Sequence, residues 1–187
     1  ILTFEKEVEH VAESSKVIAL DIGYRKLGVT SDEKVIGNGL SKIIDKASRK
    51  QQCSKSYYRS KSEIKNYINK ELKRLFEDNF SILVIEDLKN LKYGKSGKWS
   101  KSVNRKFNFW IYSYIIRRLE QLCEVAGVQC LSIPPQYTSQ RCPRCGHIEK
   151  ANRQGEKFKC LRCGFDGDAD HIAAINILNL AFGREVP

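Results

Sequence analysis

The stretch TSQRCPRCGHIEKANRQGEKFKCLRCGFDGDADHIAAINIL, residues 138–178, is the most informative part of this 187-residue sequence. It contains two Cys-x-x-Cys pairs, Cys142/Cys145 and Cys160/Cys163, with fourteen residues between them. Thiolates are soft ligands that suit zinc, and two such pairs can offer four sulfurs to one tetrahedron. We therefore predict a zinc site at these cysteines. A closed site with four sulfur ligands is structural, so the zinc is not expected to perform chemistry itself.

The spacing of the cysteines leaves two other interpretations open, an iron–sulfur site and a redox pair. His147 follows the first pair, and we expect it to be a bystander because four sulfurs already complete a tetrahedron. The remaining cysteines are scattered, which argues against a disulfide framework, and we expect them to be small neutral or buried residues: Cys53, Cys123 and Cys130. A reducing, cytoplasmic setting fits this cysteine usage best.

The charge of the chain points to a polyanionic partner. The formal net charge is +11 and the isoelectric point is near 9.3. Lysine and arginine dominate residues 42–74 and residues 89–106, and both stretches also contain aromatic residues. Because cations neutralise phosphates and aromatic rings stack on unpaired bases, nucleic acid is the expected partner. No apolar run approaches the ~20 residues of a membrane span, and no signal-peptide pattern opens the sequence.

Apolar periodicity and turn residues predict an alternating α/β chain. Short apolar strands alternate with segments of helical period, in the order βββαβαβ, and the cysteine segment and a final helix follow. The expected strands are residues 16–23, 24–32, 35–39, 81–87 and 128–133. The expected helices are the second half of residues 41–78, residues 107–126 up to a stop at Gly127, and a last helix from an N-cap at Asp168 to Gly183. Residues 89–106 are expected to form a basic loop.

Three carboxylates lie where such acids are costly unless they bind a partner. Asp21 ends the first strand, Glu86 ends a later apolar strand, and Asp170 lies in the first turn of the last helix. Hard oxygen donors from separate elements suit one or two Mg²⁺ ions, which can activate water for attack on a phosphodiester. The alternative is that each acid simply caps its element. We prefer that alternative for three other acids: Asp87, Asp166 and Asp168.

Four motifs, taken together and in this order, carry a resemblance to a known family. They are ALDIG around Asp21, VIEDLKNL around Glu86, YTSQRCPRCG with KCLRCG, and DADHIAAINIL around Asp170. From about Val17 to Leu180 the chain resembles the C-terminal nuclease half of the TnpB (OrfB) proteins. These are encoded by insertion sequences and are relatives of the type V CRISPR effectors.

The resemblance implies an RNase H-like (RuvC-like) α/β fold, with a mixed sheet, helices on its faces and an inserted four-cysteine zinc ribbon. It implies a catalytic triad of Asp21, Glu86 and Asp170 that uses Mg²⁺, with Mn²⁺ as a substitute. It also implies a DNA target and a guide RNA from the transposon end. The lobe that grips the guide in this family would precede the sequence, and no membrane is involved.

The implied organisation has four parts. Residues 1–15 would be the remnant of a preceding domain, 16–136 the RuvC-like core, 137–167 the zinc ribbon, and 168–187 the last helix and tail. Two other functions remain open. One is a non-catalytic nucleic-acid-binding module or transposon regulator with the same fold. The other, a resolvase of the RuvC type, would share the acids but does not predict the cysteines.

Overall fold

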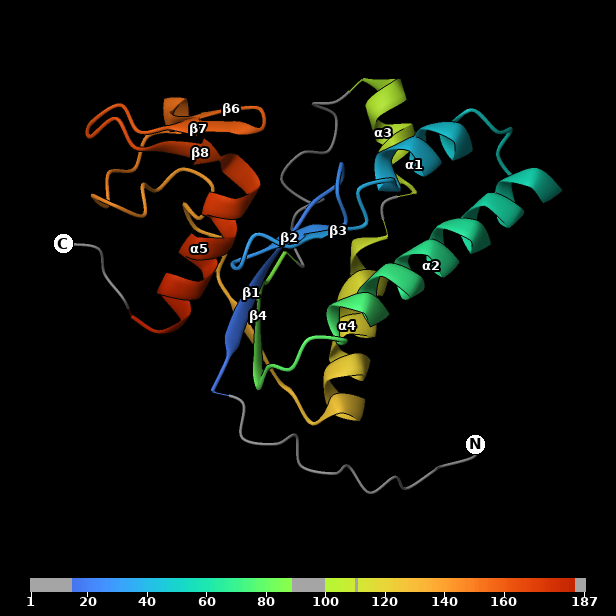
Figure 1. The fold of residues 1–187 in the computed structure, drawn as a ribbon. Coiled ribbons are helices and arrows are strands. Elements are labelled where there is room, and N and C mark those ends of the chain that lie inside the picture. The colour runs from blue at the N-terminus through green and yellow to red at the C-terminus, as the bar shows by residue number, and fades with distance from the viewer. Residues whose placement is uncertain (1–14, 89–99, 110, 184–187) are drawn as a thin grey trace.

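The computed structural model describes residues 15–88, 100–109 and 111–183 (Figure 1). Most of the predicted remnant at residues 1–15, most of the basic loop and Trp110 lie outside these ranges. Within them, no helix is long and apolar enough to cross a membrane.

A mixed five-stranded sheet in the order β3-β2-β1-β4-β5 forms the centre of the fold. β1 pairs antiparallel with β2, and β2 with β3, whereas β1, β4 and β5 run parallel. The bounds are β1 Val17–Ile22, β2 Gly28–Thr30, β3 Val35–Ile36, β4 Ile82–Glu86 and β5 Gln129–Ile133. The predicted strand order along the chain is therefore confirmed.

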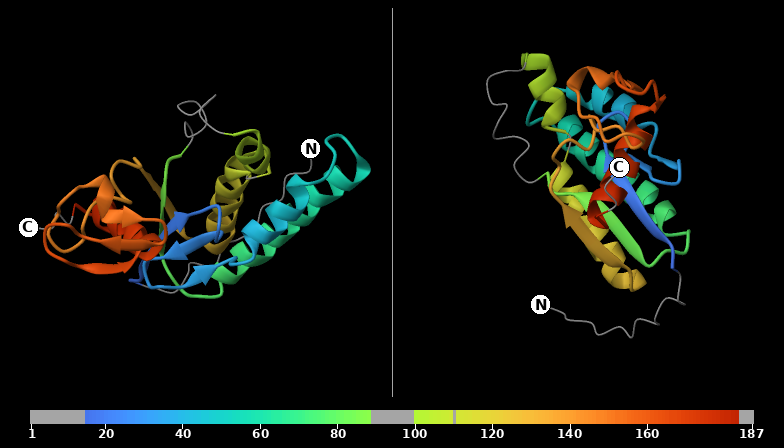
Figure 2. Two further views of the ribbon diagram at one scale, coloured as in Figure 1. Left: turned by 90° about the horizontal axis from the view of Figure 1, so that it is seen from above. Right: turned by 90° about the vertical axis from the view of Figure 1, so that its left-hand side faces the viewer.

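Helices cover both faces of this sheet. On one face lie α1 (Leu40–Ser48), α2 (Lys55–Leu75) and α4 (Tyr112–Ala126), and α5 (Ala169–Ala181) lies on the other (Figures 1 and 2). The short α3 (Lys101–Phe107) sits beside α1. Because both faces are covered, β1 and β4 are apolar on both sides, as their nearly continuous runs of apolar residues require.

The alternation of side chains along β1 separates two cores. Ile18 and Leu20 join the large core under α1, α2 and α4. Ala19 points to the opposite face and packs with Val84 of β4 and Ile177 of α5. This second core is small, and a single helix completes it. α5 is buried along much of its length, which fits its largely apolar sequence.

Local signals account for the ends of the helices. Ser54 caps α2, its hydroxyl accepting from the backbone N–H of Tyr57, and Ser100 caps α3 in the same way. Gly127 ends α4 with a positive φ of 66°, the left-handed conformation in which glycine is favoured. Asp168 caps α5, and its carboxylate accepts from the backbone N–H groups of Asp170 and His171 at 3.0 Å each. The predicted stop at Gly127 and the predicted N-cap at Asp168 are confirmed.

Two predicted segments are wrong in detail. The expected single helix over residues 107–126 is interrupted, because α3 ends at Phe107 and α4 begins at Tyr112. The interruption lets Phe109 turn into the core, where it is 2% exposed and its ring centroid lies 5.1 Å from that of Tyr57. Residues 101–106, predicted as loop, are helical, since Ser100 supplies an N-cap.

The cysteine segment folds into its own small unit between β5 and α5. It consists of the 3₁₀ turn η2 (Lys150–Asn152) and a three-stranded antiparallel sheet of β6 (Arg153–Gln154), β7 (Lys157–Lys159) and β8 (Asp166–Asp168). Its core joins two cysteines and Phe158 to Ala169 and Ile172 at the start of α5. β8 runs directly into α5, so the fold of this unit sets where that helix begins.

Asn176 links α5 to the chain segment between β5 and the cysteine unit. The side chain is 1% exposed, and its amide nitrogen donates to the backbone carbonyls of Thr138 and Arg141, both at 2.7 Å. Buried carbonyls without partners are costly, so this one amide satisfies two groups of an irregular segment that has no ladder of its own.

We predict that Asn176→Ala lowers the free energy of unfolding by roughly 2–4 kcal/mol, because two buried carbonyls lose their donor. Asn179→Ala, in the same helix and only partly buried, is the matched control and should cost much less. Chemical denaturation of the three proteins measures the difference. Equal losses in the two variants would contradict the assigned role of Asn176.

Candidate functional site

The four cysteines meet in one cluster. Their sulfurs all lie within 4.8 Å of one another. The Cys142–Cys163 and Cys145–Cys160 sulfur pairs are each 3.6 Å apart, which is far too long for a disulfide of ~2.05 Å. A tetrahedron with metal–sulfur bonds of ~2.3 Å has edges of about 3.8 Å, so the cluster has the size of a zinc site. His147 is not part of it.

The backbone around the cluster favours the thiolate form at Cys160. Burial raises the pKa of Cys160, but the backbone N–H groups of Cys163 and Arg162, together with the Cys145 and Cys163 side chains, lower it to about 6. N–H groups aimed at a sulfur are the arrangement that stabilises a thiolate, and the thiolate is the form that binds a metal. The glycine after each pair adopts a positive φ, 70° at Gly146 and 74° at Gly164, which allows the tight turn.

Two of the predicted acids lie side by side on the sheet. β1 and β4 are parallel and in register from Val17↔Ile82 to Leu20↔Ile85, so Asp21 and Glu86 are the next pair along. Both follow the alternation of Ala19 and Val84 and therefore face α5. Asp170, in the first turn of α5, is the third acid on this face. The structure thus brings together the three acids that the sequence analysis singled out.

The pKa of Asp21 reflects its burial and the nearby carboxylates. Burial, and after it the negative charges of Glu86 and Asp170, together raise the pKa of Asp21 from 3.8 to about 7. Glu86 and Asp170 therefore make ionisation of Asp21 harder, as expected of a carboxylate that shares a site with others.

Glu86 is held by two neighbours. The hydroxyl of Thr138, a buried residue, donates to its Oε1. The hydroxyl of Tyr112 donates to its backbone carbonyl at 2.7 Å. Burial raises the pKa of Glu86, and the Thr138 hydrogen bond opposes that rise. The position of this carboxylate therefore depends on the same segment that Asn176 anchors.

Two basic side chains contact Asp170, and the sequence analysis did not identify either. Arg153 of β6 places Nη2 2.7 Å from Asp170 Oδ1, and Lys26, between β1 and β2, places Nζ 3.4 Å from Asp170 Oδ2. Lys26 also lies 3.4 Å from Asp168 Oδ2. Nothing in the sequence distinguishes these two from the many other lysines and arginines. Only the fold shows that they face an acid.

The three acids are less tightly grouped than the cysteines. In the described ranges, only the four cysteines form a group of three or more histidine, cysteine or acidic residues with all ligand atoms within 4.8 Å. Arg153 and Lys26 already engage both oxygens of Asp170. Of the other acids, Asp168 is the predicted N-cap, Asp87 is exposed, and Asp166 is exposed within β8.

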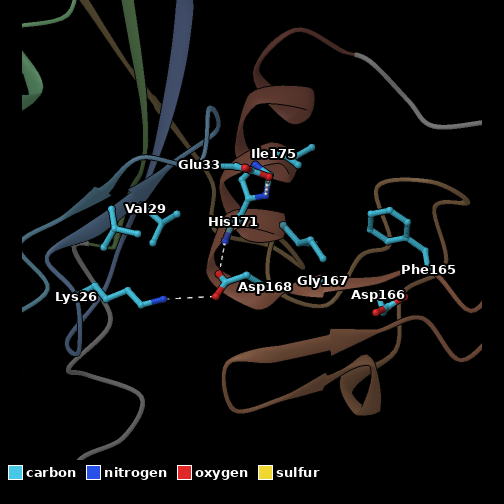
Figure 3. Close-up of a pocket in the computed structure, with 11 residues that line it drawn as sticks. Lys26, Val29, Glu33, Phe165, Asp166, Gly167, Asp168, His171 and Ile175 are labelled. Carbon is cyan, nitrogen blue, oxygen red and sulfur yellow. Dashed lines mark hydrogen bonds and ion pairs between the residues drawn. The ribbon is translucent and has the colours of Figure 1, made fainter.

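A cavity of about 470 Å³ opens beside the start of α5 (Figure 3). The β2–β3 hairpin, β8 and α5 line it, and the Lys26–Asp168 pair spans one side. His171 joins α5 to the hairpin, with Nε2 3.2 Å from the carbonyl of Ser31 and Nδ1 3.4 Å from Oε1 of Glu33. These contacts tie the turn after β2 to the helix that carries Asp170.

Comparison with known proteins identifies relatives over most of the chain. The family described as Cas12f1-like, TNB domain, matches residues 112–177. The putative RNA-guided DNA endonuclease InsQ of Escherichia coli is 30% identical over 90% of this chain and 50% of its own length. The CRISPR-associated endodeoxyribonuclease Cas12f1 of Sulfoacidibacillus thermotolerans is 45% identical over 36% of this chain, which is 16% of that protein. The chain thus spans half or less of these curated relatives.

The fold has counterparts among solved structures. A chain in the cryo-EM structure of a Cas12f1–sgRNA–target DNA complex superposes with a TM-score of 0.61 and 20% sequence identity. The match covers 91% of this chain and 51% of that one. The mixed α/β architecture is RuvC-like, with the cysteine unit inserted before the last helix. The chain is thus similar to RNA-guided endonucleases, to TnpB-like proteins and to CRISPR-associated Cas12f1 endodeoxyribonucleases.

Proposed function

We propose that this chain is the catalytic half of an RNA-guided DNA endonuclease, which hydrolyses phosphodiesters at a divalent-metal site formed by Asp21, Glu86 and Asp170. The observation that carries the proposal is the register of β1 and β4, which sets Asp21 beside Glu86 on the face where α5 begins. The curated relatives are named as DNA endonucleases, which supports the reaction class.

The donor set fits Mg²⁺, or Mn²⁺ in its place, because three carboxylates offer the hard oxygen ligands that these ions prefer. When bound, such ions activate water and stabilise the charge that develops on the phosphate. Burial and then the negative charges of Glu86 and Asp170 raise the pKa of Asp21, and a divalent cation would relieve the repulsion between these carboxylates.

The protein's own residues supply positioning and positive charge. Thr138 orients Glu86, so that carboxylate is held before any substrate arrives. Arg153 and Lys26 pair with Asp170 in the structure described. If the Asp170 carboxylate bound a divalent ion instead, Arg153 and Lys26 would be free to bind the phosphate of a DNA strand.

The four cysteines are proposed to hold a structural zinc ion, with residues 137–167 as the ribbon, residues 16–136 as the core and residues 168–187 as the last helix and tail. Thiolate ligands suit a reducing, cytoplasmic setting. The partners of the whole protein are proposed to be a DNA target and a guide RNA from the transposon end. A solved relative is described as a complex with both kinds of nucleic acid.

The ion pairs of Asp170 favour one alternative. With both of its oxygens engaged by Arg153 and Lys26, the same fold could serve as a non-catalytic nucleic-acid-binding module or transposon regulator. Metal-dependent cleavage separates the two functions.

We predict that Asp21→Ala reduces Mg²⁺-dependent cleavage of single-stranded DNA by roughly a thousandfold or more, since it removes a ligand shared by the proposed metal site. Asp166→Ala removes an exposed acid of the neighbouring ribbon and should leave the rate within about twofold of the original. Cleavage is followed on a labelled oligonucleotide, with EDTA as a blank. If Asp21→Ala cuts as fast as Asp166→Ala, the proposed mechanism is wrong.

The raised pKa of Asp21 also predicts a pH-dependent stability. Between pH 4 and pH 7 the folded chain holds a proton on Asp21 that the unfolded chain has released, so stability falls as the pH rises through this window. Asp21→Asn removes the free-energy cost of ionising a buried carboxyl in the folded chain. It should stabilise the metal-free protein at pH 8 by up to roughly 4 kcal/mol, with little effect near pH 4. Thermal melts at the two pH values measure the difference. Adding Mg²⁺ at pH 8 should raise the melting temperature of the original protein but not that of Asp21→Asn.

Removal of the proposed structural zinc should destabilise the ribbon locally, because the ion is not expected to take part in the chemistry. We predict about one zinc per chain by metal analysis, and loss of that ion in Cys145→Ser, whereas Cys53→Ser, at an exposed cysteine outside the cluster, keeps it. Hydrogen exchange should rise across residues 142–168 in Cys145→Ser and remain low in β1 and β4. Iron in place of zinc, or an unchanged metal content in Cys145→Ser, would refute the assignment.

A further inference from the structure

The surface between α1 and α3 is a basic groove that the proposed catalytic site does not use. Two adjacent hollows, of about 540 and 430 Å³, share Lys101 and Arg105 as lining residues. The first is also lined by Arg49 and Lys106, and its single acid is Asp45. We call these two hollows the α1–α3 groove.

Specific contacts build the groove. Lys106 Nζ lies 2.7 Å from Asp45 Oδ1, and Tyr24 donates to the same oxygen at 3.2 Å. Arg105 Nη2 donates to the backbone carbonyl of Lys50 at 2.6 Å. These bonds fasten α3 to α1. Arg49 and Lys101 are exposed, and the first hollow is lined by four cations against the single acid Asp45, so its lining carries an excess of positive charge.

The second hollow adds a different chemistry. Its other lining residues all carry side-chain amides: Gln51, Gln52, Asn104 and Asn108. An amide both donates and accepts hydrogen bonds, and so does the 2′-hydroxyl of ribose. Cations that meet phosphates, next to amides that meet sugar hydroxyls, match an RNA backbone better than a DNA backbone.

We propose that the α1–α3 groove binds the sugar–phosphate backbone of an RNA strand. Arg49 and Lys101 neutralise phosphates, and the amides of Gln51 and Gln52 contact ribose hydroxyls. The groove joins the ends of the two basic stretches of the sequence, which are far apart along the chain. None of the three acids lines it.

The position of the groove suits a strand that is bound but not cut. α1 and α3 lie at the same end of the molecule as the carboxyl ends of β1 and β4, on the side opposite the cysteine unit (Figure 1). Viewed from above, the central sheet lies between the cysteine unit and the helices α1 and α3 (Figure 2). An RNA held here would flank the proposed catalytic acids and leave the side next to the ribbon open.

The test measures binding in EDTA, so that its outcome does not depend on cleavage. The probes are a labelled single-stranded RNA and a DNA of the same sequence. Arg49→Gln/Lys101→Gln should weaken RNA binding by about tenfold or more and make the salt dependence shallower by about 1.4 in log–log slope. Lys70→Gln/Lys73→Gln removes the same charge from exposed positions on α2 and should cause a much smaller loss.

Two further variants test the choice of RNA and the fold. Gln51→Ala/Gln52→Ala should reduce the preference for RNA over DNA while leaving DNA binding unchanged. Arg49→Lys/Lys101→Arg should retain RNA binding, because it keeps both charges at exposed positions. Equal losses in the two charge-removing variants would overturn the proposal. If Gln51→Ala/Gln52→Ala weakens DNA binding as much as RNA binding, the proposal is overturned as well.

Discussion

The carboxamide of Asn176 connects the last helix to the irregular segment that follows β5. Its two bonds fix the backbone at Thr138 and Arg141, and the Thr138 hydroxyl in turn holds Glu86. The last helix therefore positions one acid through Thr138 and presents another, Asp170, in its own first turn. A single buried amide thus couples the segment after β5, the helix and the candidate site.

The candidate site lowers the stability of the fold, because the parallel pairing of β1 and β4 places two buried carboxylates side by side. Register places Asp21 next to Glu86 whatever else the chain does, and burial then raises the pKa of both. A sheet that only needed stability would put apolar residues there. The repulsion is retained at the carboxyl ends of two central strands, which is where a metal site would require it.

Patterns that depend on near neighbours in sequence could be predicted, and those that depend on the fold could not. The cysteine pairs, the N-cap at Asp168 and the order of strands all rest on local spacing, and they were predictable. The break between α3 and α4 was not, because only the completed core shows that Phe109 must turn inward. Arg153 and Lys26 were hidden for a different reason: in a chain with thirty-three lysines and arginines, only tertiary structure selects the two that meet Asp170.

The cysteine unit is physically connected to Asp170. The cysteine cluster lies at the core of the ribbon, the ribbon carries Arg153 on β6, and Arg153 reaches Asp170. The same unit runs through β8 into the N-cap that starts α5. A metal bound by the sulfurs would thus affect the candidate site in two ways without contacting substrate. It would fix where α5 begins, and it would hold the guanidinium of Arg153 against the carboxylate of Asp170. The cysteine unit and Asp170 are thus coupled through β8 and Arg153, and loosening the cysteine cluster would displace Asp170.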